Sequence, residues 1–149
     1  MPSVLESVAR ARGMQHLADL DFKRSVLIAK SQGKTQVEIA RAARMSQSAV
    51  SQHLKQTQDI AFPPDGFAGA SPLEICERYA AGQISSDDLK SQLVAWNFTP
   101  FPQPSDIFDD GPVPPPGTWA EVEEALSYGY LSEELYESIL DEREARGLD

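Results

Sequence analysis

Residues 34–55 read KTQVEIARAARMSQSAVSQHLK, and this stretch decides the fold of the N-terminal part of the chain. Thr35 and Glu38 have the spacing of a capping box, which starts a helix by satisfying its free amide groups. Ser46 can cap a second helix that runs to about Gln56. Because the connection between the two is too short for parallel packing, the sequence predicts a pair of helices that cross steeply.

Apolar spacing identifies the expected contact between these two helices. Ala40 on the first and Val50 on the second are small enough to let the backbones approach, and Leu54 continues the buried face. We therefore assign Val50 and Leu54 to the core. The pattern leaves the role of His53 open.

The stretch resembles the helix-turn-helix of prokaryotic and phage transcriptional regulators of the repressor or antitoxin type. The resemblance rests on Gln36 opening the first helix, Ala40 four residues later, and a Ser-Gln-Ser-x-Val-Ser run that begins at Ser46. It covers about 22 of the 149 residues. It departs from the family at Arg44, where glycine is usual; a side chain in a left-handed turn costs about 1 kcal/mol, which a fold tolerates.

The resemblance implies that the second helix lies in the major groove of double-stranded DNA, with its early exposed residues against base edges. Glutamine can form two hydrogen bonds with adenine, and serine offers a donor and an acceptor at close range. Flanking cations, polar side chains and helix N-terminal amides would hold phosphates. The expected base-reading residues are Gln47, Ser48, Ser51 and Gln52, and the expected phosphate contacts are Lys34, Thr35, Gln36, Arg44 and Lys55.

Charge divides the chain into two parts. Residues 1–60 carry nine Lys and Arg against five Asp and Glu, a net charge of +4. Residues 61–149 carry four against eighteen, a net charge of −14, so the chain as a whole stands at −10. Because DNA phosphates attract cations and repel carboxylates, the first part suits DNA. The acidic second part either has a different partner or only keeps the protein soluble.

Helical periodicity runs through most of the chain without an alternating strand of useful length, so we expect an all-α fold. Val4, Leu5 and Val8 suit a short first helix that Gly13 breaks, and Gly33 is placed to cap the helical segment before the quoted stretch. The predicted domains are a helix-turn-helix DNA-binding domain (1–60), a linker (61–71) and an acidic helical hairpin region (72–149) with hairpins 72–96 and 118–147 and a proline-rich arm 97–117.

The two predicted hairpins share one pattern: a helix, a Gly-x-apolar-Ser turn and an acidic second helix. Gly82 and Gly129 can end the first helices in a left-handed conformation, and Ser85 and Ser132 can cap the second helices. The second helices are expected to bury Leu89, Leu93 and Trp96 in one hairpin and Leu135, Tyr136, Ile139 and Leu140 in the other.

The arm holds seven of the eleven prolines, which exclude regular helix and favour an extended segment. Its aromatic side chains argue against a purely solvated spacer. The expected partner-binding residues are Phe98, Phe101, Phe108 and Trp119.

Several classes of function find no support. Cys76 is the only cysteine and the chain has two histidines, so neither a disulfide nor a metal site is expected. We recognise no catalytic set and no phosphate-binding Gly-rich loop, which argues against an enzyme and against a cofactor. No apolar run approaches the roughly 18 residues of a membrane span, and the N-terminus lacks a secretory leader. We therefore expect a cytoplasmic protein without a membrane partner.

These features predict a sequence-specific regulator of transcription that binds double-stranded DNA, a repressor whose acidic C-terminal region serves dimerisation or binds a partner protein. The base-reading face lacks Arg and Lys, so a homodimer or tandem sites would compensate for modest affinity. Two versions stay open: an antitoxin that represses its own operon and covers a basic toxin, and a phage or mobile-element repressor without a toxin. The alternative is an adaptor or inhibitor that does not bind DNA and whose acidic surface mimics nucleic acid.

Overall fold

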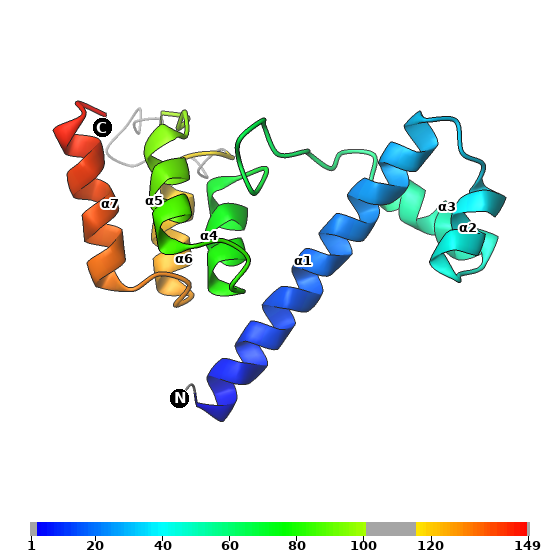
Figure 1. Ribbon diagram of the computed structural model, residues 1–149, viewed down its shortest axis with the longest axis horizontal. Helices are drawn as coiled ribbons and strands as arrows, with labels where there is room; N and C mark the ends of the chain where they lie inside the picture. The colour runs from blue at the N-terminus through cyan, green and yellow to red at the C-terminus, as the bar shows by residue number, and fades with distance from the viewer. Residues whose placement is uncertain (1–2, 101–115, 149) are drawn as a thin grey trace, which may run out of the picture. The chain divides into compact units, whose positions relative to one another are not determined.

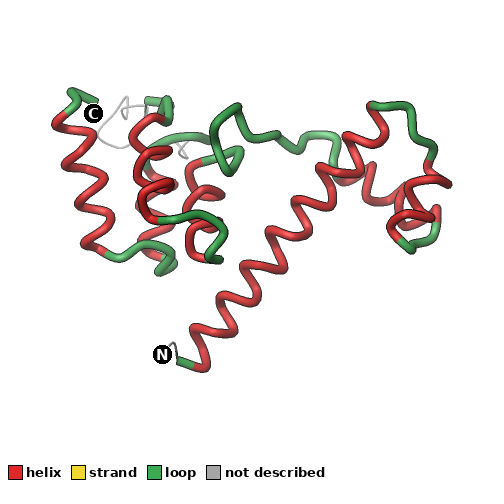
Figure 2. The backbone as a smooth tube through the Cα atoms, viewed as in Figure 1, coloured by secondary structure: helices red, strands yellow, loops and turns green. Residues whose placement is uncertain are grey.

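The computed structural model describes residues 3–100 and 116–148, and within them it holds seven α-helices and no strand (Figure 1, Figure 2). The prediction of an all-α fold is therefore confirmed. The chain divides into two compact units, residues 1–62 and 63–149, each with a hydrophobic core of its own. The helices are α1 (Val4–Ser31), α2 (Gln36–Ala43), α3 (Gln47–Gln56), α4 (Pro72–Ala80), α5 (Ser86–Ala95), α6 (Ala120–Ser127) and α7 (Glu133–Ala145).

The first helix of the N-terminal unit, α1, is longer than expected. It runs for 28 residues without interruption, so the predicted break at Gly13 is wrong. A glycine inside a helix costs about 1 kcal/mol relative to alanine, whereas a break would require a second costly helix nucleus. A reciprocal capping box between Ser3 and Glu6 starts α1. Gly33, with φ of +85°, follows its C-terminal end as predicted.

Capping residues fix where α2 and α3 begin. The Thr35 hydroxyl accepts from the Glu38 N–H at 3.1 Å and the Glu38 carboxylate accepts from the Thr35 N–H at 3.2 Å, which confirms the predicted capping box. The Ser46 hydroxyl accepts from the Ala49 N–H at 3.1 Å and starts α3. Between the helices, Arg44 adopts the left-handed conformation, with φ of 57° and ψ of 44°.

A small core holds α3 against its neighbours. It joins Val26 of α1, Ile39 and Ala40 of α2, and Val50 and Leu54 of α3, all of them buried. The assignment of Val50 and Leu54 to the core is confirmed. Because both lie on one side of α3, the opposite side of this helix faces solvent.

Polar contacts secure the chain that leaves α3. The buried Thr57 donates its hydroxyl to the carbonyl oxygen of Leu54 at 3.1 Å. Farther along, the carbonyl oxygen of Ala61 accepts a hydrogen bond of 3.0 Å from Nε of Arg24 on α1. Since Ser46 caps its other end, α3 is held at both ends.

In the C-terminal unit, α4 packs against α5 and α6, and α5 packs against α7, so the contacts join helices of both predicted hairpins (Figure 1). The hairpin turns carry the expected residues: Gly82 and Gly129 have φ of +81° and +79°, and the hydroxyls of Ser85 and Ser132 cap α5 and α7. The buried core of this unit comprises Ile75, Cys76, Leu89, Leu93, Val94, Val122, Ala125, Leu131 and Ile139.

One expected core residue of α7 lies at the surface. The Leu140 side chain is 38% exposed, so the prediction that α7 buries it is wrong. Ile139 is fully buried and takes the inward position. Successive residues of an α-helix point about 100° apart, so Leu140 is turned away from the core side of α7 that Ile139 occupies.

The single cysteine belongs to the packed interior. Cys76 is fully buried in α4. Burial, with a smaller contribution from the negative charge of Glu121, raises the pKa of its thiol to about 12 from the usual 9. Cys76 therefore serves packing and not reactivity.

We expect Cys76 to resist a thiol reagent such as dithionitrobenzoate at pH 8 while the chain is folded. Only the thiolate attacks, and this pKa lowers the thiolate fraction about a thousandfold relative to an ordinary cysteine. Urea should restore ordinary reactivity, and Leu93→Ala, which opens a cavity in the same core, should speed the reaction. A folded chain that reacts as fast as the unfolded one would contradict the burial of this thiol.

Candidate functional site

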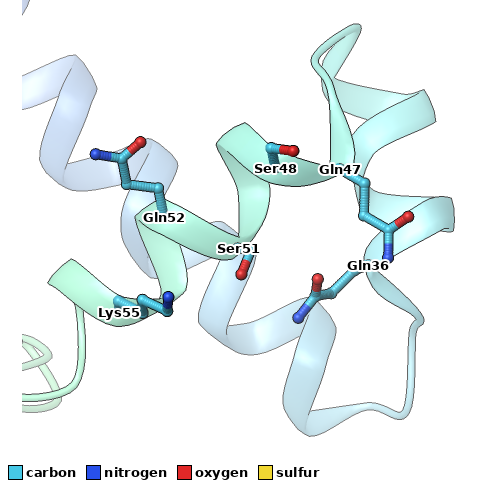
Figure 3. A pocket seen from close by; sticks show the side chains of 6 residues that line it. All are labelled: Gln36, Gln47, Ser48, Ser51, Gln52 and Lys55. Carbon is cyan, nitrogen blue, oxygen red and sulfur yellow. The ribbon is translucent and has the colours of Figure 1, made fainter.

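A shallow recess of about 600 Å³ runs along the exposed side of α3. Five of its lining residues lie on α3 at positions i, i+1, i+4, i+5 and i+8, a spacing that puts them on one face of a helix. The sixth is the first residue of α2 (Figure 3). The lining residues are Gln36, Gln47, Ser48, Ser51, Gln52 and Lys55.

The recess brings together all four predicted base-reading residues and two of the five predicted phosphate contacts, Gln36 and Lys55. Its lining offers amide, hydroxyl and ammonium groups, and no carboxylate. None of these side chains forms a hydrogen bond or ion pair with another residue in the described part of the chain. Their donors and acceptors are therefore available to a ligand.

The core of the N-terminal unit determines which face of α3 lines the recess. Val50 is fully buried, and Leu54 one turn later is nearly so. The turn before α3 is tied to α2, because the Met45 N–H donates to the Ala40 carbonyl oxygen at 2.9 Å. The recess is thus built on a packed helix and not on a loop, which favours a fixed arrangement of its side chains.

Three of the predicted phosphate contacts lie outside the recess. Lys34 lines a separate, apolar depression between α1 and α2. Thr35 is engaged with Glu38: its backbone N–H and its hydroxyl donate hydrogen bonds that lower the pKa of this carboxyl. Glu38 therefore keeps its negative charge, which makes the surroundings of Thr35 less suited to a phosphate. Arg44 is exposed in the turn that leads to α3.

His53, whose role the sequence left open, packs on the inner side of α3. Its ring lies edge-on to that of Phe22 on α1, with 5.1 Å between centroids and 82° between planes. Its Nδ1 is buried and has no hydrogen-bond partner among the described residues. Since His53 does not line the recess, its role is to pack α3 onto α1.

The second predicted site, for a partner protein, involves the C-terminal unit. The rings of Phe98 and Trp119 contact each other, with 5.1 Å between centroids. The Thr99 N–H donates to the Gly117 carbonyl oxygen at 2.9 Å, which holds the two ends of the arm together. The other two predicted residues, Phe101 and Phe108, lie outside the described residues.

Sequence reasoning missed the residue that joins these two rings. The guanidinium carbon of Arg143 on α7 lies 4.6 Å from the ring centroid of Phe98 and 5.5 Å from that of Trp119. One of its terminal nitrogens also donates to the carbonyl oxygens of Leu93 and Val94, at 3.2 and 3.1 Å. In the sequence Arg143 stands among acidic residues of a charged helix, and no local signal distinguishes it from a surface arginine.

Neither a metal site nor a membrane-spanning helix is found among the described residues. No three His, Cys, Asp or Glu side chains in residues 3–100 and 116–148 are grouped so that they could hold a metal ion. Within the same residues no helix combines the length and apolar character that crossing a membrane requires. Comparisons of the chain with models of protein families, with curated proteins and with solved structures found no match. Function is therefore inferred from the geometry of the recess and from the contacts among Phe98, Trp119 and Arg143.

Arg44→Gly should stabilise the end of α2 by about 1 kcal/mol, because glycine adopts a positive φ without the steric cost of a Cβ. The matched change Arg41→Gly, inside α2, should destabilise the helix by about the same amount. Hydrogen exchange of the Met45 amide, which closes the turn on Ala40, reports both effects. We expect its protection to rise about fivefold in the first variant and to fall in the second. Loss of protection in both would mean that the Arg44 side chain contributes more than its backbone conformation costs.

Proposed function

We propose that the N-terminal unit is a helix-turn-helix that binds double-stranded DNA sequence-specifically, and that the protein represses transcription. One observation carries the proposal: the recess on α3 unites Gln47, Ser48, Ser51 and Gln52 with Gln36 and Lys55, and their polar groups have no partner elsewhere in the described residues. An α-helix with its side chains is about 10–12 Å across, so the major groove, about 12 Å wide, admits α3.

The chemistry of the recess suits direct reading of base edges. The side-chain amides of Gln47 and Gln52 can each form two hydrogen bonds with adenine. The amide nitrogen donates to N7, and the amide oxygen accepts from the N6 amino group. Ser48 and Ser51 are short, so they allow the helix backbone to approach the bases. Lys55, one turn after Ser51, is placed to reach a phosphate. These side chains favour operators that contain adenine.

Electrostatics favours DNA at this unit and limits its affinity. The N-terminal 60 residues carry a net charge of +4, but a single cation lines the recess. Phosphate contacts supply most of the affinity in protein–DNA complexes, so one copy would bind modestly. A dimer bound to two half-sites, or copies bound to tandem sites, would raise the affinity for DNA.

The acidic C-terminal part would be repelled by DNA, so we assign it to dimerisation or to a partner protein. In the antitoxin version, the acidic part covers a basic toxin. In the phage or mobile-element version there is no toxin, and the acidic part mediates dimerisation. A second candidate function follows from the same charge of −14: an adaptor or inhibitor whose acidic surface mimics nucleic acid. That candidate predicts that the recess does not bind duplex DNA.

Selection of bound sequences from a pool of random duplexes by the full chain tests the proposal. We expect an enriched motif whose adenine preferences weaken in Gln47→Ala and Gln52→Ala, since one paired glutamine–adenine contact contributes about 1–3 kcal/mol of discrimination. Gln56→Ala is the matched control, because Gln56 is exposed on the same helix but does not line the recess. Its motif should match that of the unchanged chain.

Two outcomes would reject this function. The unchanged chain could enrich no sequence at low salt, which would favour the adaptor or inhibitor. Alternatively, Gln47→Ala and Gln52→Ala could leave the motif unaltered, which would place DNA elsewhere on the protein. A palindromic motif would in addition indicate that two copies bind.

Lys55→Ala should weaken binding to all sequences alike and should lower the slope of log affinity against log salt by about one, because one phosphate contact releases about one counterion. Lys30→Ala, an exposed change at the end of α1 and outside the recess, is the control and should leave the slope nearly unchanged. Binding measured by fluorescence anisotropy at several salt concentrations gives both slopes. Equal slopes in the two variants would remove Lys55 from the DNA contact.

A further inference from the structure

The C-terminal unit has a hollow of about 450 Å³ at the contact between the rings of Phe98 and Trp119, and we call it the aromatic hollow. Its more buried lining is Phe98, Trp119 and Arg143. Its exposed lining is Leu140, Asp141, Glu144 and Leu148. The hollow therefore has an aromatic interior, two open leucines and two carboxylates.

The interior of the aromatic hollow is held in place by its own contacts. Arg143 stacks on Phe98 and Trp119 and is tied to backbone carbonyl oxygens at the end of α5. The indole N–H of Trp119 donates to the Tyr136 hydroxyl at 3.0 Å. A surface whose side chains are fixed before binding loses little conformational freedom when a partner arrives. Tryptophan and arginine are also the residues that most often dominate protein interfaces.

The outer lining of the hollow combines apolar and acidic groups. Leu140 and Leu148 are 38% and 40% exposed, which is unfavourable for aliphatic side chains in water. Asp141 and Glu144 are exposed on α7, the helix that carries Leu140, and Leu148 follows the C-terminal end of that helix. The guanidinium of Arg143 is buried against rings and carbonyl oxygens, so the open charges of the hollow are negative. Residues 61–149 as a whole carry a net charge of −14.

We propose that the aromatic hollow binds a basic segment of another protein, in which an aliphatic or aromatic side chain enters between Trp119 and the leucines while flanking Lys or Arg pair with Asp141 and Glu144. A nucleic acid would meet repulsion from the carboxylates. A second copy of this unit would bring together two acidic parts that each carry a net charge of −14. Charge complementarity thus selects a basic protein as the occupant.

This inference rests on the proposed role of the acidic part in binding a partner, and not on DNA binding. The recess and the hollow belong to different units of the chain. Duplex selection with the glutamine variants tests the first, and a peptide experiment tests the second. Either can fail while the other succeeds.

The experiment is to pan a library of random dodecapeptides displayed on phage against the full chain. We expect enriched peptides that combine Lys or Arg with Leu, Ile, Phe or Trp. Synthetic copies of them should bind at least about tenfold more weakly to Leu140→Ser and to Asp141→Lys/Glu144→Lys. Their binding should also change the tryptophan fluorescence, because Trp119 lines the hollow.

The matched control is Glu123→Lys/Glu137→Lys, which alters the net charge equally at exposed positions outside the hollow. It should keep most of the affinity. All the substituted side chains are exposed, and an unreactive Cys76 verifies that each variant is folded. The proposal is overturned by a selection without enrichment, by enriched peptides that lack basic residues, or by equal losses in the control and hollow variants.

Discussion

The buried face of α3 is the constraint on which the N-terminal unit depends. Val50 and Leu54 pack against α1 and α2, and burial of each such side chain contributes about 1.5–3 kcal/mol. Because the side chains of a helix have fixed directions, burying these two fixes the opposite face as well. The polar recess follows from that packing: Gln47, Ser48, Ser51, Gln52 and Lys55 are presented outward because Val50 and Leu54 are held inward.

Charged side chains are placed differently in the two units. In the N-terminal unit Glu38 caps α2, and no carboxylate lines the recess. In the C-terminal unit acids dominate, and its buried cations are matched individually: Arg78 pairs with Glu74 at 3.0 Å, and Arg143 meets rings and carbonyl oxygens. Under the proposed function, an acidic part of this size would oppose DNA binding by the whole chain and would serve dimerisation or a partner protein.

Sequence reasoning succeeded where the determinant is local. Ser46, Ser85 and Ser132 cap the helices they were expected to cap, because a cap needs only one side chain and amides three residues away. The face of α3 followed from helical spacing in the same way. The continuity of α1 through Gly13 depends instead on the cooperativity of a long helix, which a single residue does not reveal.

The aromatic hollow could not be predicted from local sequence patterns, because its contacts join distant parts of the chain. Arg143 meets Leu93 across 50 positions of the chain, and a contact of that range leaves no periodic trace in the sequence. The same packing turned Leu140 outward, although its spacing on α7 equally allowed burial. Two of the four expected partner-binding residues, Phe98 and Trp119, line the hollow, and the sequence singled them out because aromatic residues beside a proline-rich segment need a surface to cover.

Two departures from the most stable arrangement lie beside the two proposed binding surfaces. Arg44 takes a left-handed conformation that glycine would adopt without strain, and it lies in the turn that leads into α3. Leu140 and Leu148 stay exposed at the aromatic hollow, where polar residues would cost less. Natural sequences violate local rules mainly at functional sites, so an outlier is a reason to suspect function. The left-handed Arg44 is consistent with the proposed contact with DNA phosphates, and the exposed leucines are consistent with the proposed partner segment at the hollow.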